Sequence, residues 1–204
     1  MKKFSRIFLV GFRATGKSTL GKLLADKLGW SFMDLDFLIT QQEGEDVGKI
    51  TKNGTDWRRF REIENEALKE MSVLKNVVIS CGGGVGVNDI PGYESGKTYG
   101  DLNAQIFKNS NNSLVVLLKT DEKIIEERLR VQYKNKKLMP FLSATEAKNS
   151  EGLDLDDLIE KLVKDSMQAL KKREPLYEKL TEIKIDTSGK TNEKIAQEVL
   201  NYVR

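Results

Sequence analysis

Residues 11–18 read GFRATGKS, and this segment constrains the fold more than any other part of the chain. It fits the pattern G-x-x-x-x-G-K-[ST] in full. The apolar run Ile7 to Val10 before it indicates a buried strand, and the amphipathic pattern from Lys17 to Leu28 after it indicates a helix. A strand, a glycine-rich loop and a helix in this order predict a phosphate-binding loop in an α/β protein.

The chemistry of this loop is that of a nucleotide site. Its backbone N–H groups are expected to point inward, and the helix N-terminus adds positive potential for a β-phosphate. Lys17 is expected to neutralise the β- and γ-phosphates, and Ser18 to bind Mg²⁺. The alternative, a glycine-rich turn with an incidental lysine, is disfavoured by the spacing and context. The loop residues assigned to nucleotide binding are Gly11, Arg13, Ala14, Thr15, Gly16, Lys17, Ser18 and Thr19.

The rest of the chain alternates strands with helices. Further strands are expected at 30–35, 76–80, 114–118 and 181–185, and further helices at 55–72, 121–131, 154–172 and about 195–203. This alternation predicts a three-layer αβα fold, in which helices cover both faces of a central five-stranded parallel sheet. Residues 1–204 are expected to form a single domain, with two polar segments, about 86–112 and about 134–153, that show no clear period.

Composition excludes several function classes. The chain has no histidine, so a proton must move through a carboxylate, a lysine or water, and His metal sites are excluded. No apolar run approaches the ~20 residues that a membrane helix needs, and no signal peptide is expected. The net charge of +3 is too mild to favour nucleic acid. The lone Cys81 fits a reducing compartment, so we expect a cytoplasmic protein.

Two carboxylates, Asp34 and Asp36, lie at the end of the second expected strand. Ligands of open α/β sheets bind at the carboxyl edge of the strands, so both could face one cleft. One would then lie near Mg²⁺ and the other near an acceptor hydroxyl. Taken alone, the pair equally fits solvated turn residues.

An arginine and a glutamate share the helix expected at 55–72. Arg61 lies at the edge of its apolar face, and Glu64 lies within that face. A buried glutamate is costly unless paired, so the two are expected to form an ion pair that holds the guanidinium in one pose. A guanidinium fixed in this way suits a bidentate contact with a carboxylate. A purely structural ion pair is the alternative.

Two further segments suggest ligand contacts. Gly82, Gly83 and Gly84 follow the third expected strand and would let a ligand approach bare backbone donors, although a flexible turn also fits. Pro175 is expected to break the helix at 154–172, which would place Arg173 in its final turn. On its own, that arginine fits a helix-terminus charge.

The set GFRATGKST, DLD, FREIE, GGG and REPLY, in this order and spacing, resembles the shikimate kinases within the nucleoside-monophosphate-kinase-like group of P-loop folds. The resemblance covers most of the chain apart from the two irregular segments. It implies that ATP and shikimate react to give ADP and shikimate 3-phosphate, with Mg²⁺ as the cofactor. It also implies small-molecule substrates only, and we expect a monomer.

The resemblance also implies roles for individual residues. Asp34 would lie near Mg²⁺ through water, and Asp36 would bind the shikimate hydroxyls and act as the base. Arg61 and Arg173 would hold the shikimate carboxylate, with Glu64 orienting Arg61.

On the same resemblance, Gly82, Gly83 and Gly84 would offer backbone donors to shikimate and the nearby phosphate. Arg128 matches an arginine near the adenine, and Ser188 and Gly189 belong to the loop that borders the adenine.

The chain departs from the family pattern in the lid, which is expected at about 134–153. The family lid usually contains Arg-Pro-Leu-Leu, whereas residues 139–142 are MPFL. Met139 cannot supply the charge that a lid arginine brings to the transferring phosphate. We expect Lys136 or Lys137 to substitute, because neutralising that group is worth several kcal/mol. Solvated lid lysines are the alternative.

Two other functions remain open at this point. A gluconate-type sugar-acid kinase would share the nucleotide half and a carboxylate-binding arginine. A nucleotide-binding regulator with weakened catalysis would fit Met139, although a pure binder has little use for Asp36 and Lys17.

Overall fold

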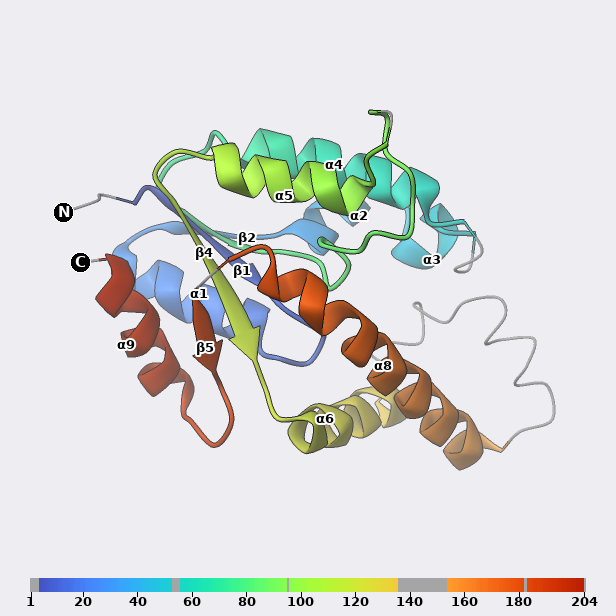
Figure 1. Cartoon of the computed structure of the whole chain (residues 1–204). Helices are drawn as coiled ribbons and strands as arrows, with labels where there is room; N and C mark the ends of the chain where they lie inside the picture. The colour runs from blue at the N-terminus through green and yellow to red at the C-terminus, as the bar shows by residue number, and fades with distance from the viewer. Residues whose placement is uncertain (1–3, 53–55, 95, 136–153, 182, 204) are drawn as a thin grey trace.

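The structure is a computed structural model, which describes residues 4–52, 56–94, 96–135, 154–181 and 183–203 (Figure 1). Its centre is one parallel sheet with the strand order β2-β3-β1-β4-β5. At the middle of the sheet, Phe8 pairs with Ile79 on one side and with Val115 on the other. The strands are β1 (Arg6–Val10), β2 (Ser31–Asp34), β3 (Val77–Ser80), β4 (Ser113–Lys119) and β5 (Lys184–Asp186). The predicted five-stranded parallel sheet is therefore confirmed.

Helices cover both faces of the sheet, as predicted (Figure 1). Along β1, Ile7 and Leu9 pack toward α1 and α9, whereas Phe8 and Val10 belong to the larger core on the opposite face. Because both faces of the strand are buried, its sequence is continuously apolar rather than alternating. The two helices on the first face are α1 (Lys17–Leu28) and α9 (Asn192–Val203). The other helices are α2 (Leu35–Glu43), α3 (Val47–Ile50), α4 (Arg58–Met71), α5 (Tyr99–Asn109), α6 (Glu122–Lys134) and α8 (Leu155–Glu178).

The structure corrects the expected position of Asp36. The second strand ends at Asp34, whose Oδ1 accepts a hydrogen bond from the Phe37 N–H and caps α2. Asp36 therefore lies in the first turn of a helix and not at the end of a strand. The hydrogen bond to Asp34 stabilises the first turn of α2, so the helix begins directly after this residue. The short apolar run before it is not enough to extend the strand further.

The segment 86–112, expected to be irregular, contains helix α5. Thr98 and Asp101 form a capping box at its start, which satisfies the first backbone donors of the helix. Its buried side chains include Leu102 and Phe107. The polar residues between them conceal the helical period in the sequence.

Helix α8 also differs from the expectation, because Pro175 does not break it. The helix continues to Glu178, so Arg173 lies inside the helix rather than in its final turn. A proline removes one helical hydrogen bond and crowds the preceding turn. Tertiary contacts on both sides of Pro175 offset this cost, since Arg173 and Tyr177 each donate a hydrogen bond to the Gly83 carbonyl.

Within the described residues, none of the helices is both long and apolar enough to cross a membrane.

Two buried amides join α4, α5 and the segment after the three glycines. Asn65 Nδ2 donates to Asn103 Oδ1 at 2.7 Å, and Asn103 Nδ2 donates to the Val85 carbonyl at 2.8 Å. Asn65 is 1% exposed and Asn103 is fully buried. Through the hydrogen bond to Val85, this pair of amides fixes the backbone directly after the three glycines.

Replacing Asn103 with alanine should destabilise the protein strongly, because a buried donor and a buried carbonyl lose their partners. We expect Asn103→Ala to lower the free energy of unfolding by about 3 kcal/mol in urea denaturation. The matched control is Asn109→Ala at the exposed end of α5, which should change it by less than about 0.5 kcal/mol. Equal values for the two variants would contradict a structural role for the amide pair.

Candidate active site

The phosphate loop joins β1 to α1 at the carboxyl edge of the sheet. Lys17 is 9% exposed, and its Nζ donates to the carbonyls of Gly11 at 3.0 Å and Phe12 at 2.8 Å. Burial lowers the pKa of Lys17, which the nearby charges of Asp36 and Asp34 partly oppose. Thr15 Oγ1 also donates to the Phe12 carbonyl. The loop thus brings the buried Lys17 ammonium group close to the N-terminus of α1. Both carry positive charge or potential, so this position favours binding of an anion.

Three oxygen-bearing side chains meet beside the loop. Ser18 Oγ donates to Asp34 Oδ2 at 2.6 Å and shares a hydrogen bond with Ser80 Oγ at 3.3 Å. These residues come from α1, β2 and β3. Sequence reasoning paired Ser18 with Asp34 as metal-site residues but missed Ser80. Its position as the last residue of β3, directly before Cys81 and the glycines, was the available signal.

Asp36 lines a cavity beside the loop, together with Arg61 and Gly83. Burial, together with the charges of Glu64 and Asp34, raises the pKa of Asp36 to about 7 against the opposing effects of Lys17 and Arg61. A carboxyl group with a pKa near neutrality can both accept and release a proton under physiological conditions. Asp36 therefore has the electrostatic setting of a general base.

The predicted ion pair between Arg61 and Glu64 is confirmed. Arg61 Nη1 lies 2.7 Å from Glu64 Oε2, and the two side chains are 4% and 0% exposed. The guanidinium carbon lies 5.1 Å from the Trp57 ring centroid and 5.5 Å from that of Phe60. Burial opposes the charge of Arg61, but the charge and hydrogen bond of Glu64 outweigh it and raise the pKa of Arg61. The guanidinium is fixed by its partner and by two rings, so it stays charged and oriented.

The three glycines lie against these charged groups. A Cβ on Gly82 would lie 2.5 Å from Asp36 Oδ1 and 2.9 Å from Glu64 Oε1. A Cβ on Gly84 would overlap the Arg61 guanidinium. The lack of side chains at these two positions is therefore a packing requirement, and a flexible turn is the weaker interpretation.

Gly83 connects the glycine segment to α8. Its carbonyl accepts a hydrogen bond from Arg173 Nη1 at 3.1 Å and another from the Tyr177 hydroxyl. Burial lowers the pKa of Arg173, and burial raises the pKa of Tyr177 to about 12. Tyr177 was not predicted as a site residue, although it ends the REPLY segment.

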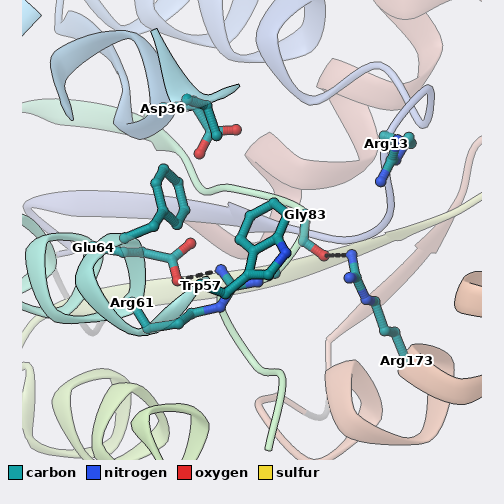
Figure 2. Close-up of a pocket in the computed structure, with 10 residues that line it drawn as sticks. Arg13, Asp36, Trp57, Arg61, Glu64, Gly83 and Arg173 are labelled. Carbon is teal, nitrogen blue, oxygen red and sulfur yellow. Dashed lines mark hydrogen bonds and ion pairs between the residues drawn. The ribbon is translucent and has the colours of Figure 1, made fainter. Parts of the chain in front are cut away.

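These groups surround one cavity of about 120 Å³. Figure 2 shows Arg61 and Glu64 on one side of the opening, with Arg13 and Arg173 on the other. Asp36 lies on a third side, and Trp57 covers the middle. The structure therefore brings the two predicted acceptor arginines, Arg61 and Arg173, to one cavity with Asp36. Sequence reasoning missed Trp57 there and assigned Arg13 to the nucleotide.

A second, larger groove of about 550 Å³ runs along the other side of the loop. Thr15, Asp121 and Ser188 line it, and Ser188 Oγ accepts a hydrogen bond from the Asp121 N–H at 2.8 Å. Arg128 and Gly189 are outside its lining. Arg128 Nη1 instead donates to the Ala14 carbonyl at 2.9 Å and so contacts the phosphate loop directly.

The three predicted lid residues, Lys136, Lys137 and Met139, lie outside the described residues. The roles proposed for them from the sequence remain predictions.

Comparison with known proteins identifies the relatives of this chain. The family described as shikimate kinase matches residues 13–204. A shikimate kinase of Thermodesulfovibrio yellowstonii is 34% identical over 195 residues, which are 95% of this chain and 92% of that protein. A shikimate kinase of Persephonella marina is 30% identical over 198 residues, which are 97% of this chain and 98% of that protein.

Solved structures give the same result. The crystal structure of a shikimate kinase from Bacteroides thetaiotaomicron has a TM-score of 0.69 and 27% identity, covering 98% of each chain. A shikimate kinase from Acinetobacter baumannii in complex with shikimate has a TM-score of 0.71 and 25% identity, covering 99% of this chain and 94% of that chain.

The raised pKa of Asp36 should make the stability of the unliganded protein depend on pH. The native state binds the Asp36 proton more tightly than the unfolded state, so this residue destabilises the fold as pH rises from about 4 to about 7. We expect Asp36→Asn to raise the free energy of unfolding by about 4 kcal/mol near pH 8 and by almost nothing near pH 4. Urea denaturation at both pH values measures this.

The control for this experiment is Asp26→Asn on the exposed surface of α1. It should change the free energy of unfolding by less than about 0.5 kcal/mol at either pH. A stability gain of Asp36→Asn that is the same at both pH values would show that Asp36 is not held in an unfavourable charged state.

Proposed function

The chain belongs to the shikimate kinase family, and from this premise we propose how its residues transfer the γ-phosphoryl group of ATP to the 3-hydroxyl of shikimate. The activity is that of an ATP-dependent small-molecule kinase in aromatic amino acid biosynthesis. One observation supports the residue assignments above all others. Asp36, Arg61 and Arg173 line one cavity directly beside the phosphate loop.

The nucleotide phosphates bind at the loop of residues 11–19. Lys17 exchanges its two hydrogen bonds to backbone carbonyls for charge-assisted bonds to the β- and γ-phosphates. This exchange is favourable because a buried ammonium group without an anion is destabilised, as its lowered pKa indicates. The adenine lies toward the groove lined by Ser188, with Arg128 and Gly189 at its border.

Mg²⁺ fits the cluster of Ser18, Asp34 and Ser80. Ser18 Oγ lies within hydrogen-bond range of both Asp34 Oδ2 and Ser80 Oγ. Mg²⁺ in kinases is held by one or two protein oxygens together with phosphates and water. Ser18 would hold the ion through its hydroxyl, and Asp34 would contact it through water. When bound, the ion neutralises charge on the phosphate oxygens.

The acceptor binds in the cavity on the other side of the loop. Arg61 and Arg173 hold the shikimate carboxylate, because guanidinium groups bind carboxylates through parallel hydrogen bonds. Glu64 keeps Arg61 in position. Gly82, Gly83 and Gly84 offer backbone N–H groups to shikimate and to the phosphate, and Gly83 is the partly exposed residue of the three.

The chemical step needs only one proton acceptor. Asp36 takes the proton of the 3-hydroxyl while that oxygen bonds to the γ-phosphorus and the bond from phosphorus to the β–γ bridging oxygen breaks. The products are ADP and shikimate 3-phosphate. Phosphoryl transfer depends mainly on positioning and charge neutralisation, which is why the absence of histidine from the sequence is no obstacle.

Two further properties belong to this proposal. The protein works as a monomer, which is supported by an acceptor cavity built from one chain. It works in the cytoplasm, which its single buried cysteine supports, since Cys81 has no partner for an internal disulfide.

A coupled assay of ADP release tests the function directly. We expect release that requires shikimate and Mg²⁺, with no release on gluconate. Arg173→Met should raise KM for shikimate about 30-fold, because a charge-assisted contact is lost, and change KM for ATP less than about 3-fold. The control Arg59→Met removes an exposed arginine of α4 and should leave both unchanged. Turnover on gluconate alone would identify a sugar-acid kinase, and ATP binding without any product would identify a regulator.

The pH dependence tests Asp36 as the base. The base must be ionised to accept a proton, so kcat/KM for shikimate should rise with pH through about 7 and then level off. Asp36→Asn should lower kcat about 1,000-fold and abolish this rise. Asp26→Asn should keep the wild-type profile. If the rise persists in Asp36→Asn, another group is the base.

A further inference from the structure

Arg13 lies between the phosphate loop and the acceptor cavity. It is the third residue of the loop, and it lines the same cavity as Asp36, Gly83 and Arg173 (Figure 2). Its backbone is close to the glycine segment, because a Cβ on Gly83 would lie 3.5 Å from the Arg13 nitrogen. Arg13 is not part of the lining of the large groove on the nucleotide side. Its side chain therefore faces the acceptor, although its backbone belongs to the nucleotide loop.

The charges around the cavity leave Arg13 without an assigned anion. Three guanidinium groups line the cavity, and Arg61 is paired with Glu64. The shikimate carboxylate occupies Arg61 and Arg173 in the proposed function. Among the described residues no carboxylate forms an ion pair with Arg13, and the one hydrogen bond of its guanidinium there goes to the neutral Tyr133 hydroxyl at 3.4 Å.

Arg13 also lies close to other cations. The guanidinium carbons of Arg13 and Arg173 lie 5.5 Å and 6.0 Å from the centroid of the same Phe12 ring. Burial lowers the pKa of Arg173 and of Lys17, and the charge of Arg13 lowers both further. Like charges held this close destabilise one another until an anion comes between them. An anion at this point would lie in the cavity that Arg13 and Arg173 line together with Asp36.

We propose that Arg13 binds the phosphoryl group during its transfer and supplies there the positive charge that Met139 cannot provide. The inference rests on the proposed function. Negative charge spreads over the equatorial oxygens of the phosphoryl group in the transition state, and a cation beside its path stabilises that state more than the bound substrates. A guanidinium suits this role because its planar N–H groups can contact two oxygens at once.

Tyr133 is the positioning residue for Arg13. Its hydroxyl accepts the Arg13 hydrogen bond and shares another, at 2.9 Å, with Ser166 Oγ. Tyr133 is 4% exposed and Ser166 is 5% exposed, so α6 and α8 hold this hydroxyl in a fixed place. One Nη atom of Arg13 is thereby restrained, and its other N–H groups remain available to the phosphoryl oxygens.

The central experiment compares steady-state kinetics of Arg13→Met, Arg13→Lys and Arg59→Met. We expect Arg13→Met to lower kcat about 100-fold, with KM for shikimate and for ATP changed less than about 3-fold, because the lost contact belongs to the transition state. Arg13→Lys should recover part of kcat by restoring the charge, and Arg59→Met should match the wild type. Thermal denaturation and ADP binding establish that each variant is folded.

A second measurement does not depend on turnover. ADP, shikimate and aluminium fluoride together mimic the transferring phosphoryl group. We expect Arg13→Met to weaken binding of aluminium fluoride about 100-fold and to leave binding of ADP with shikimate within about 3-fold of the wild type.

Tyr133→Phe, which removes only the hydroxyl, should lower kcat about 5-fold without raising either KM.

Three results would overturn the proposal. One is an unchanged kcat in Arg13→Met. Another is a raised KM for shikimate with kcat unchanged, which would make Arg13 a substrate-binding residue only. The third is a loss of kcat in the double variant Lys136→Ala, Lys137→Ala but not in Arg13→Met, which would assign the charge to the lid lysines. If the wild type shows no shikimate-dependent ADP release, the proposed function itself fails, and this outcome is distinguishable from the other three.

Discussion

The buried ion pair between Arg61 and Glu64 determines the arrangement of the whole acceptor side. The guanidinium fits only because Gly84 has no side chain, and the carboxylate fits only because Gly82 has none. The charge of Glu64 also contributes to the raised pKa of Asp36. Removing one partner of a buried pair typically costs about 3–5 kcal/mol, since the other charge is left without compensation. The proposed recognition of a carboxylate by Arg61 and the proton affinity of the proposed base therefore depend on the same contact.

The parallel sheet explains why the two halves of the site meet. The loop after β1, the oxygens of Asp34 at the end of β2 and the glycines after β3 all lie at one carboxyl edge, because parallel strands end on the same side. Helix α8 then closes the cavity from the far side through two hydrogen bonds to Gly83. The nucleotide loop and the acceptor cavity are thus adjacent by topology, and only a few side chains complete the reaction site.

The site holds several carboxylates close to one another and several cations close to one another. Charged substrates and Mg²⁺ would compensate these like charges when they bind. The charges of Glu64 and Asp34 raise the pKa of Asp36, and the charge of Arg13 lowers the pKa of Arg173 and of Lys17. Such groupings lower the stability of the unliganded protein, which is a common cost of a site prepared for charged ligands. In return, little reorganisation is needed when charge develops on the phosphoryl group. The expected stability gain of Asp36→Asn and its expected loss of activity have this same origin.

The sequence by itself determined the phosphate loop, the helix that follows it, the parallel sheet and the pairing of Arg61 with Glu64. The loop, the helix and the ion pair follow from local spacing and from the cost of burying a charge, so one chain segment is enough to predict each of them. The parallel sheet follows from the alternation of strands and helices along the chain. Tertiary structure decided that Asp36 lies on a helix, that α8 continues through Pro175 and that Arg13 lines the same cavity as Asp36. It also brought Ser80, Tyr177 and Trp57 to the site. Each of these depends on a contact with a distant segment, such as the Gly83 carbonyl for α8, and local sequence does not contain that information.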